Sequence, residues 1–164
     1  MSAASGSNAS DGASPRLERL PPTRRSDYPH FDTIDTRWAD NDRYGHVNNA
    51  VYYFYFDTVI NRYLIGPGGL DIEKDPVIAI TAETGARFHR SFAYPERIEA
   101  GMRVARLTER SVRYEIGLFA AGEERSRVDG HFVHVFVDRA TMRPTQMPAR
   151  MREALGRLLI SAAR

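Results

Sequence analysis

The sequence contains no cysteine, and Lys74 is its only lysine. Without cysteine, a disulfide framework and thiol chemistry are excluded, which fits the cytoplasm. No apolar run reaches the ~20 residues that a membrane-spanning helix needs. Residues 1–14 also lack the basic and apolar regions of a secretory signal. We therefore expect a cytoplasmic protein without a membrane span.

Arginine carries nearly all the positive charge, in a chain whose formal net charge is +2. The arginines are scattered among Asp and Glu, and no nucleic-acid-binding motif is present, so nucleic acid is not an expected partner. Compositional bias is one interpretation of this predominance of arginine. Binding of a phosphorylated ligand is the other, because a guanidinium pairs bidentately with phosphate. His131 and His134 would lie on opposite faces of one strand, so we expect no metal site.

The length of 164 residues suits one domain with a real core. Residues 1–28 are rich in Ser, Ala, Gly, Pro and Arg and show no apolar periodicity, which predicts a disordered N-terminal tail. Residues 29–164 are then expected to form the single folded domain.

The stretch from Arg37 to Asp57 organises the rest of the chain. A polar loop carries two carboxylates, a glycine and a histidine, and an aromatic helix follows it. Asn48 or Asn49 is a plausible N-cap, and the helix should end near Ile65, before a run of Gly and Pro. One broad helix face is apolar, which predicts a helix wrapped by other elements. That face comprises Tyr52, Tyr55, Phe56, Val59, Ile60 and Tyr63.

Strand-like segments precede and follow this helix. They span 31–38, 76–90, 96–109, 111–120 and 125–137. The last four are joined by short links, which predicts an antiparallel meander. A short C-terminal helix is expected over 151–160, with its apolar side formed by Met151, Leu155, Leu158 and Leu159. The predicted fold class is α+β, with an antiparallel sheet of about five strands curled around a long central helix.

The run from Asp42 to Asn49, Asp-Arg-Tyr-Gly-His-Val-Asn-Asn, followed by Tyr52, resembles the signature of hotdog-fold acyl-CoA thioesterases. The similar branch is the 4-hydroxybenzoyl-CoA thioesterase-like family, to which plant acyl-ACP thioesterases are related. The resemblance extends from about Phe31 to Leu159. It implies a hotdog fold and hydrolysis of a fatty or aromatic acyl-CoA, with coenzyme A as part of the substrate and no separate cofactor.

The resemblance implies that Asp42 is catalytic, either attacking the thioester carbonyl or activating water as a general base. The backbone N–H near Asn49 would polarise the thioester oxygen, because a helix N-terminus offers unpaired donors and positive partial charge. The alternative for Asp42 is an Asx-turn role. His46 would protonate the departing thiolate or orient the loop, and Asp40 is expected to be structural.

Further residues are candidates for binding the substrate. Tyr44, where some relatives carry asparagine, would line the acyl pocket. Tyr52 would either line that pocket or pack in the core, and Gly45 would supply a special backbone conformation. The other candidates are Asn48, Arg87, His89 and Arg90. The last three follow one strand and would meet the phosphates of coenzyme A, unless they are simply an exposed strand end.

Asp57 is a second carboxylate, roughly 12 Å along the helix from Asn49. It would serve a partner's site in a dimer, or merely contact Asn61. Family resemblance implies a homodimer or homotetramer with sites at the interface. Two other functions stay open, an acyl-ACP thioesterase and a hotdog module that binds thioesters or proteins without turnover.

Overall fold

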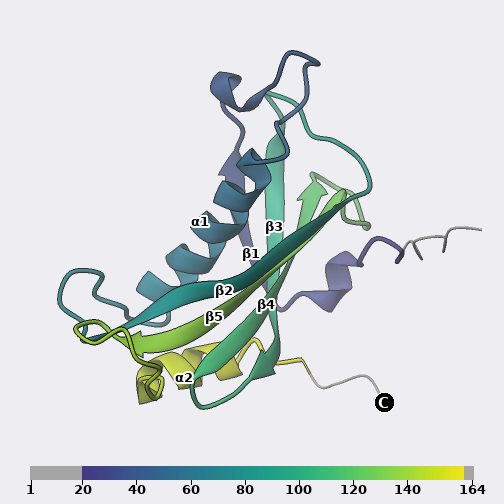
Figure 1. Ribbon diagram of the computed structural model, residues 1–164. Helices are drawn as coiled ribbons and strands as arrows, with labels where there is room; N and C mark the ends of the chain where they lie inside the picture. The colour runs from purple at the N-terminus through teal and green to yellow at the C-terminus, as the bar shows by residue number, and fades with distance from the viewer. Residues whose placement is uncertain (1–19, 161–164) are drawn as a thin grey trace, which may run out of the picture.

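The computed structural model describes residues 20–160, which form a five-stranded antiparallel sheet with a long helix on one face (Figure 1). The strands are β1 (His30–Asp35), β2 (Val77–Phe88), β3 (Arg97–Leu107), β4 (Ser111–Ala120) and β5 (Val128–Asp138). The helices are α1 (Val51–Ile65) and α2 (Ala149–Gly156). The predicted α+β class, with its sheet, central helix and short C-terminal helix, is confirmed. No helix within 20–160 is long and apolar enough to cross a membrane.

The strand order is β1-β3-β4-β5-β2. The predicted meander is confirmed for β3, β4 and β5, but β2 pairs with β5 rather than with β3. The segment between β2 and β3 therefore crosses the end of the sheet. Phe92 holds this crossing segment in place, because its side chain is fully buried and its carbonyl accepts from the backbone N–H of Val47 at 2.8 Å.

The core lies between α1 and the inner face of the sheet. All six residues of the predicted apolar helix face are buried, as is Leu64. Phe56 approaches β5 closely because Gly130 has no side chain there: a Cβ at Gly130 would lie 2.4 Å from the Phe56 ring. The helix therefore rests directly on the backbone of a central strand, and its N-terminus has a fixed position relative to the sheet.

The start of α1 differs from the prediction. The helix begins at Val51 and its N-cap is Ala50, whose side chain makes no capping bond. The Asn48 side chain instead accepts from the Ala50 N–H at 2.9 Å, before the first helical residue. Asn48 therefore shapes a turn leading into the helix, since Asx side chains bond the backbone two residues on.

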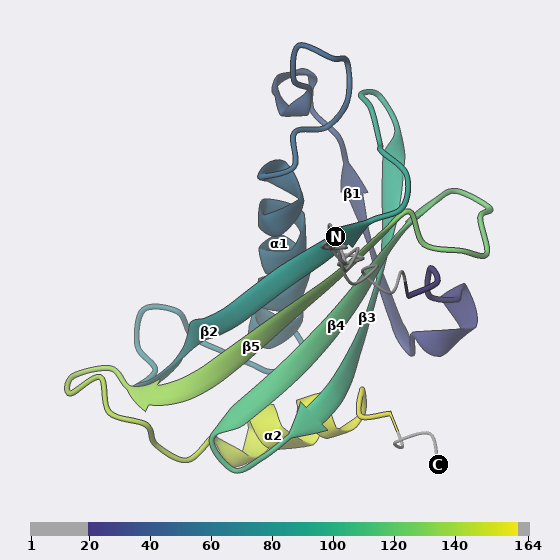
Figure 2. The same cartoon turned by 45° about the vertical axis from the view of Figure 1, so that its right-hand side comes forward.

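The C-terminal helix α2 lies at the end of the sheet away from the loop that precedes α1 (Figures 1 and 2). The Val104 N–H donates to the Leu158 carbonyl at 2.8 Å, and the Tyr63 hydroxyl donates to the Ala154 carbonyl at 2.8 Å. Met151, Leu155 and Leu158 are buried as predicted, whereas Leu159 is exposed.

The N-terminal segment departs from the predicted tail. Residues 1–19 lie outside the described part of the chain, but residues 20–28 pack on the face of the sheet opposite α1 (Figure 2). Tyr28 is buried over Gly101 and Gly117, which face each other on β3 and β4, and a Cβ at either glycine would lie 2.7 Å from Tyr28. Composition alone misses this contact because a few isolated residues make it.

Candidate active site

The loop before α1 is a tight turn closed by backbone hydrogen bonds. Asn41 and Val47 form an antiparallel bridge, and the Asp42 N–H donates to the His46 carbonyl at 2.8 Å. Gly45 has a φ of 80°, in the left-handed region that favours glycine. The special backbone conformation predicted for Gly45 is present, and it turns the chain so that Asp42 and His46 stand side by side.

The Asp42 carboxylate is held on one side only. Its Oδ1 accepts from the backbone N–H of Tyr44 at 2.8 Å and from that of His46 at 3.4 Å. This is the Asx-turn contact weighed as the alternative role. Within residues 20–160, Oδ2 accepts no hydrogen bond. The turn therefore fixes the direction of the carboxylate and leaves one oxygen open.

Asp40 is the structural anchor of the loop, as expected from the sequence. It is 1% exposed and accepts from the Arg37 backbone N–H at 2.7 Å and from the Tyr55 hydroxyl at 2.6 Å. Burial opposes ionisation, but the bonds from Arg37 and Tyr55 outweigh it and hold the pKa of Asp40 below its usual value. The Asp40 carbonyl also accepts from the Asn48 N–H at 2.9 Å, which ties the loop to the entry of α1.

The turn that leads into α1 leaves the backbone N–H of Asn49 available at the loop. The Asn48 side chain takes the N–H of Ala50, and the Asn48 carbonyl takes that of Val51 at 2.9 Å. Within 20–160 the Asn49 N–H donates to no protein acceptor. A helix N-terminus carries positive partial charge, so this N–H can receive an oxygen on which negative charge develops.

A cavity of about 340 Å³ opens at this junction and brings together seven of the ten predicted site residues. Their shared feature is position at the end of the sheet nearest the α1 N-terminus. They are Asp42, Tyr44, His46, Asn49, Tyr52, His89 and Arg90. Gly45 and Asn48 shape the loop without lining the cavity.

The floor of the cavity is aromatic. Tyr52 is 1% exposed, its ring lies 5.3 Å from that of Phe88, and its hydroxyl accepts from the Phe92 N–H at 3.0 Å. Burial raises the pKa of Tyr52, so the hydroxyl stays protonated. Phe88 and Ser91 also line the cavity and were not predicted. Only the crossing of the segment after β2 brings them here, and no local pattern indicates it.

A network of charged groups supports the crossing segment. Arg127 pairs with Glu96 at 2.7 Å and with Glu123 at 2.8 Å, and its backbone carbonyl accepts from the N–H groups of His89 and Arg90. The bonds from Arg127, with help from Arg90, lower the pKa of Glu123 to about 2. Arg127 thereby places two predicted substrate-binding residues, and no local sequence pattern indicates this role.

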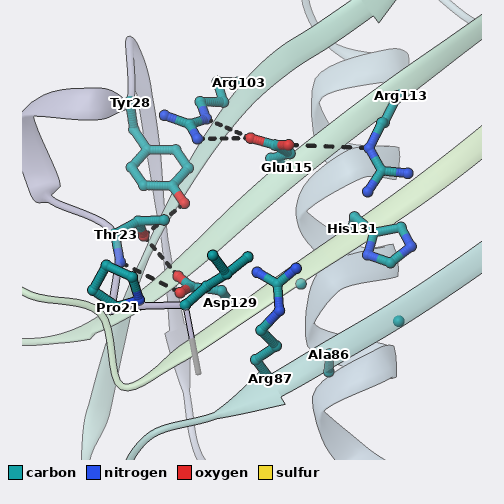
Figure 3. Close-up of a pocket in the computed structure, with 13 residues that line it drawn as sticks. Pro21, Thr23, Tyr28, Ala86, Arg87, Arg103, Arg113, Glu115, Asp129 and His131 are labelled. Atoms are coloured by element: carbon teal, nitrogen blue, oxygen red, sulfur yellow. Dashed lines mark hydrogen bonds and ion pairs between the residues drawn. The ribbon is translucent and has the colours of Figure 1, made fainter. Parts of the chain in front are cut away.

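Arg87 is separated from the other candidates. It lines a second cavity of about 470 Å³ on the face of the sheet opposite α1, between the strands and the N-terminal segment (Figure 3). Successive strand residues point to opposite faces, so Phe88 turns towards α1 while Arg87 turns away. Grouping Arg87 with His89 and Arg90 by sequence proximity overlooked this alternation.

Asp57 lies on the exposed side of α1. Its carboxylate accepts from the Asn61 side chain at 3.0 Å, the helix-face contact considered as its alternative role. Near the loop, aromatic side chains remain largely uncovered: Trp38 is 80% exposed and Tyr44 is 87% exposed.

Comparison with known proteins identifies the family to which this arrangement corresponds. The family model of the thioesterase-like superfamily matches residues 36–155, which include the loop, α1 and the whole sheet after it. The chain belongs to the thioesterase-like superfamily. The comparison with curated proteins found no match.

Solved structures resemble this thioesterase-like protein over most of its length. The PA5185 protein of Pseudomonas aeruginosa is 48% identical, with a TM-score of 0.85, covering 87% of this chain and 100% of that one. The PA2801 protein of the same organism, provisionally described as a thioesterase, is 26% identical, with a TM-score of 0.72, covering 77% and 97%. The DHNA-CoA thioesterase of Staphylococcus aureus is 20% identical, with a TM-score of 0.64, covering 71% and 78%, and shares the fold. The predicted hotdog fold and thioesterase family are confirmed.

Proposed function

We propose that this thioesterase-like protein hydrolyses a fatty or aromatic acyl-CoA to the free acid and coenzyme A. One observation carries the proposal. Asp42 and Asn49 line one cavity at the N-terminus of α1, and within residues 20–160 one carboxylate oxygen of Asp42 and the backbone N–H of Asn49 have no hydrogen-bond partner. A base or nucleophile beside an oxyanion donor is the arrangement that acyl transfer to water requires.

The thioester carbonyl would lie between these two groups. Asp42 Oδ2 either takes a proton from the attacking water or attacks the carbonyl carbon itself, and the Asn49 N–H stabilises the negative oxygen that forms. The carbon–sulfur bond then breaks, and the thiolate leaves as coenzyme A after taking a proton; where Asp42 is the nucleophile, water then hydrolyses the acyl–Asp42 anhydride to the free acid and restores the carboxylate. His46, which also lines the cavity, is the proposed donor of that proton.

The coenzyme A arm would leave the cavity past His89 and Arg90. These two residues also line a neighbouring groove of about 480 Å³, which continues towards Arg125 and Ser126. The two cavities therefore share His89 and Arg90, and the groove is lined by Glu123 and Glu124 as well as by Arg90 and Arg125. The two arginines support a free coenzyme A carrier, because guanidinium groups recognise phosphate.

Asp42→Asn tests the proposal most directly. The amide keeps an acceptor for the turn but is neither a base nor a nucleophile, so we expect hydrolysis of octanoyl-CoA or benzoyl-CoA to fall roughly 10²–10⁴-fold with the fold intact. Thiol release measures the rate and circular dichroism the fold. Asp57→Asn is the matched control and should retain activity. Near-normal turnover in a folded Asp42→Asn protein would refute the assignment, and loss in Asp57→Asn would move the carboxylate role to the helix.

Arg90→Gln tests the path of the carrier. We expect a higher KM for acyl-CoA, because a phosphate contact is lost, and an unchanged KM for the corresponding acyl-pantetheine, which lacks the nucleotide. Arg87→Gln, on the other face of the sheet, should change the KM for acyl-CoA much less. A larger effect from Arg87 than from Arg90 would place the nucleotide on the opposite face.

We also propose that the protein is a homodimer or a homotetramer. β2 is an edge strand with one bonded neighbour, and Trp38, Tyr44 and Phe54 are exposed around the α1 side. Pairing of edge strands between copies would cover both features. Sedimentation equilibrium measures the mass, and a monomer at micromolar concentration would contradict the proposal.

A further inference from the structure

His89 of the cavity is bonded to a buried carboxylate on the far side of the strand pair. Its Nε2 lies 2.9 Å from Oδ2 of Asp129 on β5, and the side chains are 18% and 8% exposed. The His89 backbone is fixed as well, because its N–H donates to the Arg127 carbonyl at 2.8 Å. Ring and backbone are therefore both held, although His89 lies in a connecting segment.

The Asp129 carboxylate is itself held by the N-terminal segment. The Thr23 hydroxyl lies 2.6 Å from Asp129 Oδ1, and the Thr23 N–H lies 3.3 Å from Oδ2. The Tyr28 hydroxyl lies 2.9 Å from the Thr23 hydroxyl, and Figure 3 shows these three side chains in line. Part of the segment predicted to be a disordered tail thus contacts Asp129, whose other partner, His89, lines the cavity.

The direction of these hydrogen bonds follows from their chemistry. A carboxylate only accepts, so both Thr23 Oγ1 and His89 Nε2 donate to Asp129, and the Thr23 oxygen is left to accept from Tyr28. Burial raises the pKa of Tyr28, which keeps its hydroxyl a donor. In the histidine tautomer that carries its proton on Nε2, the other ring nitrogen, Nδ1, is an acceptor.

We propose that Asp129 is a positioning residue for His89, and that Thr23 holds Asp129 so that His89 Nδ1 accepts a hydrogen bond from an amide N–H of the pantetheine arm. This inference rests on the proposed function and adds the part of the carrier that is recognised. The arm carries two amides and runs between the thioester and the phosphates. It therefore passes the wall formed by His89 when the thioester reaches Asp42.

Asp129→Asn tests the proposal with little change of shape. The new amide can donate to Nε2, which moves the ring proton to Nδ1 and removes the acceptor. We expect the KM for octanoyl-CoA and for octanoyl-pantetheine to rise by the same roughly threefold to tenfold. The rate with the octanoyl thioester of 2-mercaptoethanol, which has no amide, should stay unchanged. Equal damage to all three substrates would show a merely structural role and overturn the proposal.

The Thr23 hydroxyl is tested by a matched pair. Thr23→Val keeps the shape but removes the donor, so it should raise the same two KM values, and Thr23→Ser should restore them. Ser26→Ala, an exposed change in the same segment, is the control and should behave as the wild type. No effect of Thr23→Val in a folded protein would remove the N-terminal segment from the proposal.

Nitrogen-15 NMR of the histidine rings measures the tautomer of His89 independently of catalytic turnover. The wild type should show His89 as the Nε2–H tautomer, and Asp129→Asn should shift it to Nδ1–H. A wild-type Nδ1–H ring would overturn the inference even if hydrolysis is normal. If the wild type hydrolyses none of these thioesters, the proposed function fails and the pantetheine contact with it, whereas an Nε2–H ring that changes in Asp129→Asn still supports control of His89 by Asp129.

Discussion

His134 couples the stability of the fold to pH. It lies on the inner face of β5, is 4% exposed and packs against Tyr114 with ring centroids 5.2 Å apart. Burial lowers its pKa from 6.5 to about 4, because the charged ring would lose its hydration. The native state therefore resists binding a proton that the unfolded chain binds readily.

The sign and size of the effect follow by linkage. The stabilisation is fully present above pH 6.5 and is lost as the pH falls from there through about 4, since only the unfolded chain binds the proton in that range. Between pH 7 and pH 5 this single group is expected to remove about 2 kcal/mol of unfolding free energy. That is a large fraction of the 5–15 kcal/mol typical of a domain.

Urea unfolding at pH 7 and pH 5 measures the effect. His134→Leu has no titrating group, so its unfolding free energy should fall about 2 kcal/mol less than that of the wild type over this interval. Carboxylates that titrate in the same range contribute equally to both proteins and cancel in the difference.

Phe132→Leu is the matched control, on the same face of the same strand. It should destabilise the protein equally at both pH values, because a lost aromatic contact has no proton linkage. A wild-type and a His134→Leu protein that lose equal stability between pH 7 and pH 5 would refute the assignment of a neutral, buried His134.

Two more predictions concern the loop and the N-terminal segment. Asp40→Ala leaves the buried Tyr55 hydroxyl without its acceptor, whereas the Arg37 side chain is mostly exposed, so it should cost about 1–3 kcal/mol in unfolding free energy by urea titration. Gly117→Ala places a Cβ 2.7 Å from the Tyr28 hydroxyl, so it should cost about 1–3 kcal/mol. It should also speed trypsin cleavage within residues 20–28.

Each of these two substitutions has a control substitution elsewhere in the chain. Asp35→Ala removes a carboxylate whose pair with Arg97 is exposed on both sides, and it should have little effect. Gly156→Ala adds a Cβ with nothing within 4 Å and should leave trypsin cleavage unchanged. Destabilisation by Asp35→Ala equal to that by Asp40→Ala would contradict the buried role of Asp40. Unchanged cleavage of Gly117→Ala would contradict the packing of Tyr28.

The elements of the fold were predictable because their signals are local. The apolar face of α1 follows from helical periodicity, and β4 follows from its own residues and the turns beside it. The position of β2 was not predictable, because a short link between two strands favours pairing but does not enforce it. Burial of Phe92, which belongs to the crossing segment, favours pairing of β2 with β5 instead. The contacts that bury Phe92 join residues distant in sequence.

The candidate site likewise has a part that local sequence predicts and a part that depends on contacts between distant residues. Asp42, Gly45 and His46 belong to one turn, so their spacing alone predicts their mutual position. His89 and Arg90 are predicted to lie near them only because both residues follow a predicted strand. The error over Arg87 shows the limit of that idea, since strand alternation decides which face a side chain meets. The contribution of Asp129 has no sequence signal, because its partners Thr23 and His89 come from two other parts of the chain.

The crossing segment after β2 explains why the loop, the helix and the strand end act as one unit. Val47 of the loop donates to the Phe92 carbonyl, Tyr52 of the helix accepts from the Phe92 N–H, and Arg127 of the sheet side stacks on the Phe92 ring at 4.8 Å. A single residue thus joins all three walls of the cavity. This segment therefore sets the distance between Asp42 and His89. Substitutions within the segment should weaken binding of the proposed coenzyme A carrier while the protein still folds.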